Sequence, residues 1–279
     1  MARKKSNRLR ARRGITEREV RDVEEMSTPR TPVIYEVVRR QGTEEIARPA
    51  SSLWWSGVAG GLSISFSLLA MAILETHLPE AGWRVLVTSL GYTIGFLIVI
   101  LGRQQLFTES TITAVLPVLK DTTLDNLWQM ARLWSIVLAA NLTGTLFAAV
   151  FCSFAPVLPN ELLESMRSIS RHSLNEHSWW EMVFDGVSSG FLMAAMVWMI
   201  PAAEMLKLYV IVLMTWLIAV GGFTHIVAGS VEAFLLLVAG EWSIGTLLWQ
   251  FLVPVLIGNI IGGTALFAVL SYAQVKEEI

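Results

Sequence analysis

The sequence predicts an all-α membrane protein with six transmembrane helices, arranged as two inverted three-helix repeats whose second and fifth helices are broken. Of its 279 residues, 54% are hydrophobic and 16% are charged, whereas soluble domains carry about 25% charged residues. The apolar residues form stretches long enough to cross a bilayer, and short sequence words recur in the same order in both halves. With Cys152 as the one cysteine, a disulfide scaffold is excluded.

Residues 1–49 are predicted to form a basic, partly disordered cytoplasmic tail, because they hold 13 of the 21 Lys and Arg residues. The segment RKKSNRLRARR at 3–13 has two interpretations. It either attracts anionic lipid or only keeps the N-terminus in the cytoplasm. No nucleic acid partner is expected, since no aromatic residues interleave with these charges. Residues 50–273 are predicted to form the membrane domain and 274–279 a cytoplasmic C-terminus.

Four stretches have the length and polarity of an ordinary span of about 20 residues, and they cover 53–74, 127–152, 182–203 and 244–272. The other two, 85–119 and 208–239, are too long for one straight crossing and too short for two. At 1.5 Å per residue, each would reach about 50 Å across a hydrocarbon core of about 30 Å. A single crossing by a broken helix is the economical solution, and such a break must be buried in protein or line a wet cavity.

Six crossings place both termini on one side of the membrane. The positive charge supports the cytoplasm as that side, because the tail and four further basic residues then face it, namely Lys120, Arg132, Lys207 and Lys276.

The two halves of the chain share three sequence words. NLTG at 141–144 matches NIIG at 259–262 with an offset of 118, and LFT at 106–108 matches GFT at 222–224 with an offset of 116. The first span begins with Trp-Trp and then Gly57, and the fourth begins with Trp-Trp and then Gly186. Units with an odd number of spans must be inverted in the membrane, and such repeats bring their broken helices together near the midplane.

Ionisable side chains at bilayer depth are costly and mark candidate functional positions, here Arg103, Glu109, Asp185, His225 and Glu232. His225 lies in the second break, close to two glycines and Phe223. Its imidazole exchanges a proton near neutral pH and so could serve a passing weak-acid anion. The alternative is a structural histidine bonded to a free backbone carbonyl.

The first break carries a second group of candidates. Leu106 and Phe107 form either an apolar gate or ordinary packing, and Thr108 offers its hydroxyl either to an anion or to a free carbonyl. Arg103 and Glu109 flank these residues. The favoured interpretation is that they form an ion pair with each other, or with Glu232 and Asp185, that holds the loop; the alternative is direct contact with the substrate in the pore.

No enzyme signature occurs, since neither HExxH nor GxSxG is present. We therefore expect no catalytic residue, no cofactor and no metal site.

The chain resembles the formate/nitrite transporter family over residues 40–273. The resemblance rests on GxxxLFT at 102–108, GFxH at 222–225 with Ala228, and PVxIGNIIGG at 254–263. It implies an aquaporin-like homopentamer with one pore per protomer, which passes small monovalent anions or their neutral acids. In that picture His225 is the central pore histidine, Thr108 its partner on the opposite loop, and Leu106 with Phe107 the apolar constriction.

Two functional hypotheses follow. The first is a channel or proton-coupled transporter in a bacterial inner membrane, with Arg103 attracting anions where relatives use a lysine. The second is a non-conducting scaffold or regulatory protein that keeps the transporter fold and uses its tail to bind partners or lipid.

Overall fold

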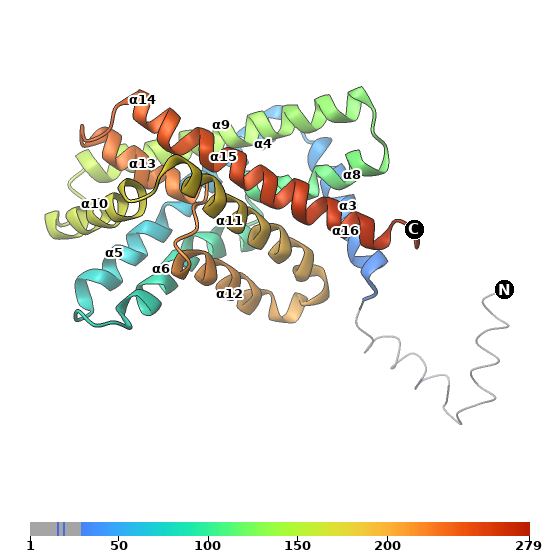
Figure 1. Cartoon of the computed structure of the whole chain (residues 1–279), viewed down its shortest axis with the longest axis horizontal. Coiled ribbons are helices and arrows are strands. Elements are labelled where there is room, and N and C mark those ends of the chain that lie inside the picture. Colours follow the sequence, from blue (N-terminus) through green and yellow to red (C-terminus); the bar gives the residue numbers. More distant parts are fainter. Residues whose placement is uncertain (1–15, 17–18, 20–28) are drawn as a thin grey trace.

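The computed structural model describes residues 16, 19 and 29–279, and every regular element within them is a helix (Figure 1). The basic segment 3–13 lies outside the described residues. The first repeat contains a long first span, a broken second span and a long third span, formed in chain order by α4 (Ala50–Ile64), α5 (Phe66–His77), α6 (Arg84–Leu101), α7 (Phe107–Thr113), α8 (Val115–Lys120) and α9 (Leu124–Phe154).

A helix outside the repeats, α10 (Asn160–Asn175), leads into the second repeat. This repeat contains α11 (Trp179–Met199), two short helical turns (Ile200–Ala202 and Glu204–Leu206), and the broken pair α12 (Lys207–Val220) and α13 (Ala228–Val238). The last span is continuous from Ile244 to Val275 and alternates between α-helix and π-helix, in the order α14 (Ile244–Thr246), η3 (Leu247–Leu252), α15 (Val253–Ile260), η4 (Ile261–Ala268) and α16 (Val269–Val275).

The predicted spans agree with these helices. Among the described residues, five helices are long and apolar enough to cross a membrane, and the sixth predicted crossing, 208–239, is divided between α12 and α13. Both crossings are broken as predicted, since α6 and α7 are separated by residues 102–106 and α12 and α13 by residues 221–227. The first break lies slightly earlier than predicted, because Phe107 and Thr108 form the first turn of α7.

Glycines allow the two repeats to pack in the same way. α4 packs on α9, and α11 packs on α15. A Cβ atom on Gly61 would overlap the Asn141 carbonyl oxygen, and one on Gly190 would overlap the Asn259 carbonyl oxygen. These close backbone approaches need a residue without a side chain, as is common between membrane helices.

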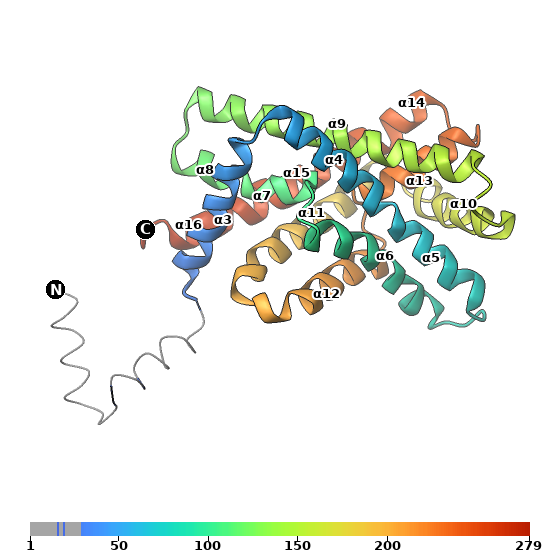
Figure 2. The ribbon, with the colours of Figure 1, turned by 180° about the vertical axis from the view of Figure 1, so that it is seen from behind.

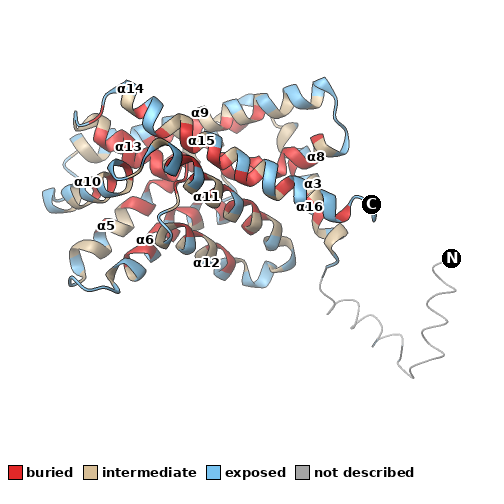
Figure 3. Ribbon diagram, viewed as in Figure 1, coloured by how far each residue is buried: buried red, intermediate tan, exposed pale blue. Residues whose placement is uncertain are grey.

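The turn between α5 and α6, α10 and α14 lie at one end of the molecule, while α8, α16 and the C-terminus lie at the other (Figures 1 and 2). Buried residues line the inward faces of the helices, and exposed ones lie at the ends and on the outer faces (Figure 3). We call the α10 end the outer end, in keeping with the predicted cytoplasmic termini.

One helix was not predicted. α3 (Thr31–Ile46) lies in the stretch assigned to the tail, and it begins with a proline in its first turn, where a missing N–H costs nothing. Gly42 brings it against the backbone of Thr113 in α7, and the Thr113 hydroxyl donates a hydrogen bond of 2.6 Å to Glu45. The α7–α8 half of the broken second span is therefore covered by a helix that precedes the membrane domain.

Candidate functional site

The two helix breaks meet inside the protein. Thr108, at the start of α7, and His225, in the second break, lie 2.8 Å apart from hydroxyl Oγ1 to ring Nε2. Both side chains are buried, with His225 only 1% exposed. The expectation that the breaks face each other is thus confirmed at the level of side-chain contact.

The His225 ring is held on three sides. Its Nδ1 accepts a hydrogen bond of 3.1 Å from the backbone N–H of Ala228, and the edge of the ring system packs against Phe96 with centroids 5.2 Å apart. Because a backbone N–H can only donate, the neutral ring carries its proton on Nε2. Nε2 therefore donates to Thr108, which leaves the threonine hydroxyl proton free for another acceptor.

Asparagines hold both loops in place. Asn141 on α9 accepts from the Phe107 N–H (2.9 Å) and donates to the carbonyls of Gly57 (2.8 Å) and Gln105 (2.9 Å). In the second repeat, Asn259 accepts from the Ile226 N–H (2.9 Å) and donates to the carbonyls of Gly186 (3.0 Å) and Thr224 (3.2 Å). Each amide satisfies backbone groups that the helix break leaves unpaired.

These bonds correct the predicted loop alignment. Gln105 and Thr224 play the same part, as do Phe107 and Ile226, so the loops correspond with an offset of 119 rather than 116. Leu106 is therefore the counterpart of His225. The shared Phe-Thr word is a chance match, whereas the predicted pairing of Asn141 with Asn259 and of Gly57 with Gly186 is confirmed.

The ends of the half-helices follow the same register. Backbone bonds from Gln104 N–H to the Val99 carbonyl and from Phe223 N–H to the Ile218 carbonyl, each 3.0 Å, close the two ends. The residue that reverses the chain has a positive φ in both, 50° at Arg103 and 66° at Gly222. Arg103 thus occupies a left-handed position that favours glycine.

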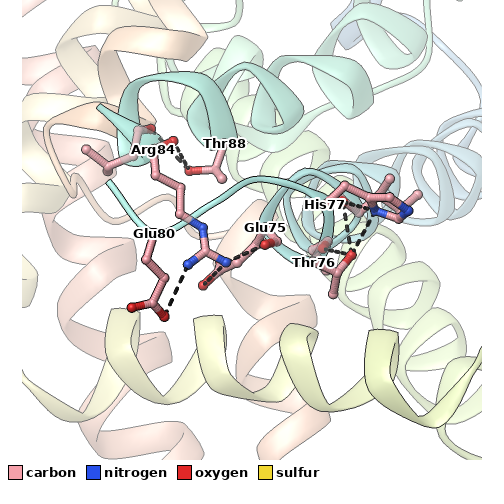
Figure 4. A network of polar contacts seen from close by, with 9 residues as sticks. Glu75, Thr76, His77, Glu80, Arg84 and Thr88 are labelled. Carbon is pink, nitrogen blue, oxygen red and sulfur yellow. Dashed lines mark hydrogen bonds and ion pairs between the residues drawn. The ribbon is translucent and has the colours of Figure 1, made fainter. Parts of the chain in front are cut away.

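A cavity of about 650 Å³ leads from the outer end to His225. Its inner part is lined by Phe223, His225 and Glu232, and its outer part by residues of the α5–α6 turn and α10. At the mouth, the Arg84 guanidinium contacts the Glu75 carbonyl oxygen and lies 3.7 Å from the Glu80 carboxylate, and its own carbonyl accepts from Thr88 (Figure 4).

The other predicted residues lie away from this cavity. Leu106 and Phe107 are each 1% exposed, and the Phe107 ring packs against Trp134 with centroids 5.9 Å apart. Arg103 is exposed, and Glu109 lies near Glu45 and Lys207.

The predicted ion pairs do not form. Neither Arg103 nor Glu109 has an ionic partner among the described residues, and Asp185 lies 3.6 Å from His177 instead. The loop is held by the neutral amide of Asn141, so the interpretation of Arg103 and Glu109 as a structural ion pair was wrong.

Sequence reasoning missed the outer lining of the cavity, which includes Arg84, Tyr92, His172 and His177. No helix was predicted for residues 153–178, which contain α10. The sequence feature that indicates this helix is the helical spacing of Leu162, Met166 and Ile169, which pack against the protein core in α10.

Comparison with known proteins identifies the family. The sequence model of the formate/nitrite transporter family matches residues 32–273. The chain belongs to this family. It is 44% identical over 250 residues to the inner membrane protein YfdC of Escherichia coli K12, which covers 90% of this chain and 80% of the relative. It is 25% identical to the formate channel FocA of Haemophilus influenzae, over 75% of this chain and 81% of that protein.

Two solved structures of the family share the fold. A pentameric formate channel with formate bound superposes with a TM-score of 0.69 at 20% identity, covering 82% of this chain and 98% of its own. An FNT family ion channel superposes with a TM-score of 0.75 at 19% identity, covering 86% and 98%. The all-α, broken-helix fold predicted from the sequence is the fold of this family.

Proposed function

We propose that the protein is a membrane channel or proton-coupled transporter for a small monovalent anion or its neutral acid. The observation that carries this proposal is the contact between His225 and Thr108 at the inner end of the cavity. A ring N–H and a hydroxyl lie there between two broken helices, where an anion finds hydrogen-bond donors. Membership of the formate/nitrite transporter family supports the same class of substrate.

His225 is proposed to donate a hydrogen bond or a proton from Nε2 to the substrate. An anion enters an apolar passage only at a high cost in free energy, because its charge must be removed from water. A proton taken from the doubly protonated imidazolium removes that charge and leaves the neutral imidazole, which then takes its next proton from water; the neutral ring donates only a hydrogen bond. Thr108 holds the ring proton in place until the substrate arrives.

Phe223, Leu106 and Phe107 are proposed as the apolar part of the pathway on either side of this contact. Phe223 lines the outer cavity, and the two buried residues of the first loop would have to move for a substrate to pass. Arg103 and Glu109 are proposed to act only through the shape of this loop, since they lie outside the cavity lining.

We further propose a homopentamer in a bacterial inner membrane, with both termini in the cytoplasm. The solved relative described as a pentameric formate channel supports the assembly, and YfdC, described as an inner membrane protein, supports the location. Exposed aromatic residues on the outer faces, such as Trp55 and Phe147, suit burial in lipid or in a subunit interface.

The test is uptake by liposomes that contain the purified protein. Formate, nitrite, acetate and hydrosulfide are offered from about pH 8 to about pH 5, the range in which an imidazole changes charge. We expect uptake of at least one of them to rise with acidity and to be lost in His225→Ala. The control His77→Ala removes an exposed imidazole at the outer end, where it bonds only locally to Thr76 and Ile73, and should leave uptake unchanged. Intact assemblies that pass none of these solutes would favour the scaffold hypothesis.

A further inference from the structure

Glu232 is a buried carboxyl that the proposed mechanism does not use. It lies on α13, is 6% exposed, and is one of the residues that line the cavity described above. Its Oε2 atom is buried and has no hydrogen-bond partner among the described residues. A carboxylate in such a place is costly, and either a proton or a ligand that donates a hydrogen bond removes that cost.

The helix that carries Glu232 begins just after His225, and both residues line the cavity. The N–H of Gly229 bonds to the His225 carbonyl (2.8 Å), so the helical turn begins at the histidine. α13 runs from this break toward the outer end (Figure 1), and at about 1.5 Å per residue Glu232 lies about 6 Å beyond Ala228, the first residue of the helix. A solute that enters from the outer end therefore meets Glu232 before it reaches His225.

The other charged groups of the cavity lie nearer its mouth and have partners there. Arg84 lies beside Glu75 and Glu80 (Figure 4), His172 is 2.8 Å from Glu176, and His177 is 3.6 Å from Asp185. The titratable lining groups that share the cavity with Glu232 and His225, taken over every element around it, are Glu75, Arg84, Tyr92, His172, Glu176 and His177. Among these, Arg84 is the one permanent cation, so carboxylates outnumber it.

We propose that Glu232 is a proton donor in the outer half of the pathway, an inference that rests on the proposed transport function. The O–H bond of the protonated carboxyl breaks, and a new O–H bond forms on an oxygen of the incoming weak-acid anion. Glu232 is left as a carboxylate and takes its next proton from water in the cavity. The solute then moves on to His225 as a neutral acid, because the ionised lining repels an anion.

The test compares four proteins in the same liposome assay. Glu232→Gln keeps the size of the side chain but cannot release a proton, and Glu232→Asp keeps the carboxyl. Glu161→Gln is the matched control, since Glu161 is exposed on α10 and outside the cavity lining. We expect Glu232→Gln to lower acid-stimulated uptake at least about tenfold, since a positioned acid contributes about 100-fold or more where proton transfer limits the rate. Glu232→Asp should keep the acid stimulation with a shifted midpoint, and Glu161→Gln should match the parent protein.

Infrared difference spectroscopy gives a second measurement that needs no transport. A protonated-carboxyl band that responds to pH should be present in the parent protein and absent in Glu232→Gln. If Glu232→Gln kept both the band and the acid stimulation while His225→Ala lost uptake, the role of Glu232 would be refuted and the proposed function would stand.

If the parent protein carried no solute, the proposed function would fail, and the proton-transfer role would fail with it even where the band identified a proton on Glu232. If Glu232→Gln did not assemble, Glu232→Asp would carry the test, and an unshifted pH profile with an unshifted band would overturn the inference.

Discussion

At the scale of single residues, Asn141 and Asn259 perform the same task in the two repeats. Each amide binds one N–H and one carbonyl of a helix break, and one carbonyl of the neighbouring helix α4 or α11, in the buried interior. Leaving a buried polar group unpaired costs about 1–3 kcal/mol. These two side chains therefore help to hold both loops, together with Ser56 and Ser189.

We expect Asn259→Ala to lower the free energy of unfolding by about 1–3 kcal/mol, because it leaves the Ile226 N–H without its acceptor. The carbonyls of Gly186 and Thr224 keep the Ser189 hydroxyl as a partner. Thermal unfolding in detergent measures this, with Asn141→Ala expected to behave alike. Asn126→Ala is the control, since Asn126 makes an exposed bond to Asp121. An Asn259→Ala protein as stable as Asn126→Ala would contradict the anchoring role.

Arg103 and Gly222 form a second matched pair, both with positive φ at the end of a half-helix. A side chain in this conformation costs about 1–2 kcal/mol. Gly222→Ala is therefore expected to lower the melting temperature, whereas Arg103→Gly is expected to leave it unchanged or raise it. Differential scanning calorimetry of the two variants measures both melting temperatures. A loss of stability in Arg103→Gly would show that the guanidinium makes an interaction that compensates for the strain.

At the scale of elements, α10 is tied to the loop after α13 by charge. Arg171 binds the Glu241 carboxylate through two bonds of 2.8 Å and also binds Glu164. The hydrogen bonds from Arg171 lower the pKa of Glu241 below its ordinary value of 4.5. Glu241 therefore stabilises the folded protein above about pH 4.5, and this contribution is lost as the pH falls through the lowered pKa.

We expect Glu241→Gln to loosen α10 at neutral pH and to make little difference at strongly acid pH, where the parent carboxyl is protonated as well. Limited proteolysis measures this loosening as faster cleavage between residues 155 and 178. Since the pair is partly exposed, a double-mutant cycle with Arg171→Gln should yield a coupling of no more than about 1 kcal/mol. If Glu241→Gln and the parent protein were cleaved at the same rate at neutral pH, the role of the Arg171–Glu241 pair in holding α10 would be refuted.

At the scale of the whole molecule, the outer faces are the most informative feature. Large apolar side chains remain exposed on several spans, among them Trp55 at 70% and Phe147 at 60%. Lipid covers part of this surface, and in the proposed assembly neighbouring subunits cover the rest. Native mass spectrometry from mild detergent should therefore find particles of five chains, each of 30.9 kDa. Particles of one chain that still carry solutes in liposomes would refute the assembly while leaving the pathway intact.

The sequence by itself determined the class of fold and the positions of both helix breaks. These follow from the length and polarity of each apolar stretch, which the bilayer thickness constrains locally. It also determined that His225 lies in the second break and that Asn141 and Asn259 are related. The fold class, the breaks and the place of His225 depend on residues that are neighbours along the chain. The relation between the two asparagines depends on a sequence motif that both repeats contain.

Only the tertiary structure decided the loop register, the absence of the Arg103–Glu109 pair, the packing of α3 on α7, and the place of Glu232 in the cavity. In the loops, equivalence is defined by which backbone groups the two asparagines bind, and a shared Phe-Thr word carries no information about those bonds. The partners of a buried charge are likewise set by helices far apart in sequence, whose spatial order the chain reveals only when it is folded.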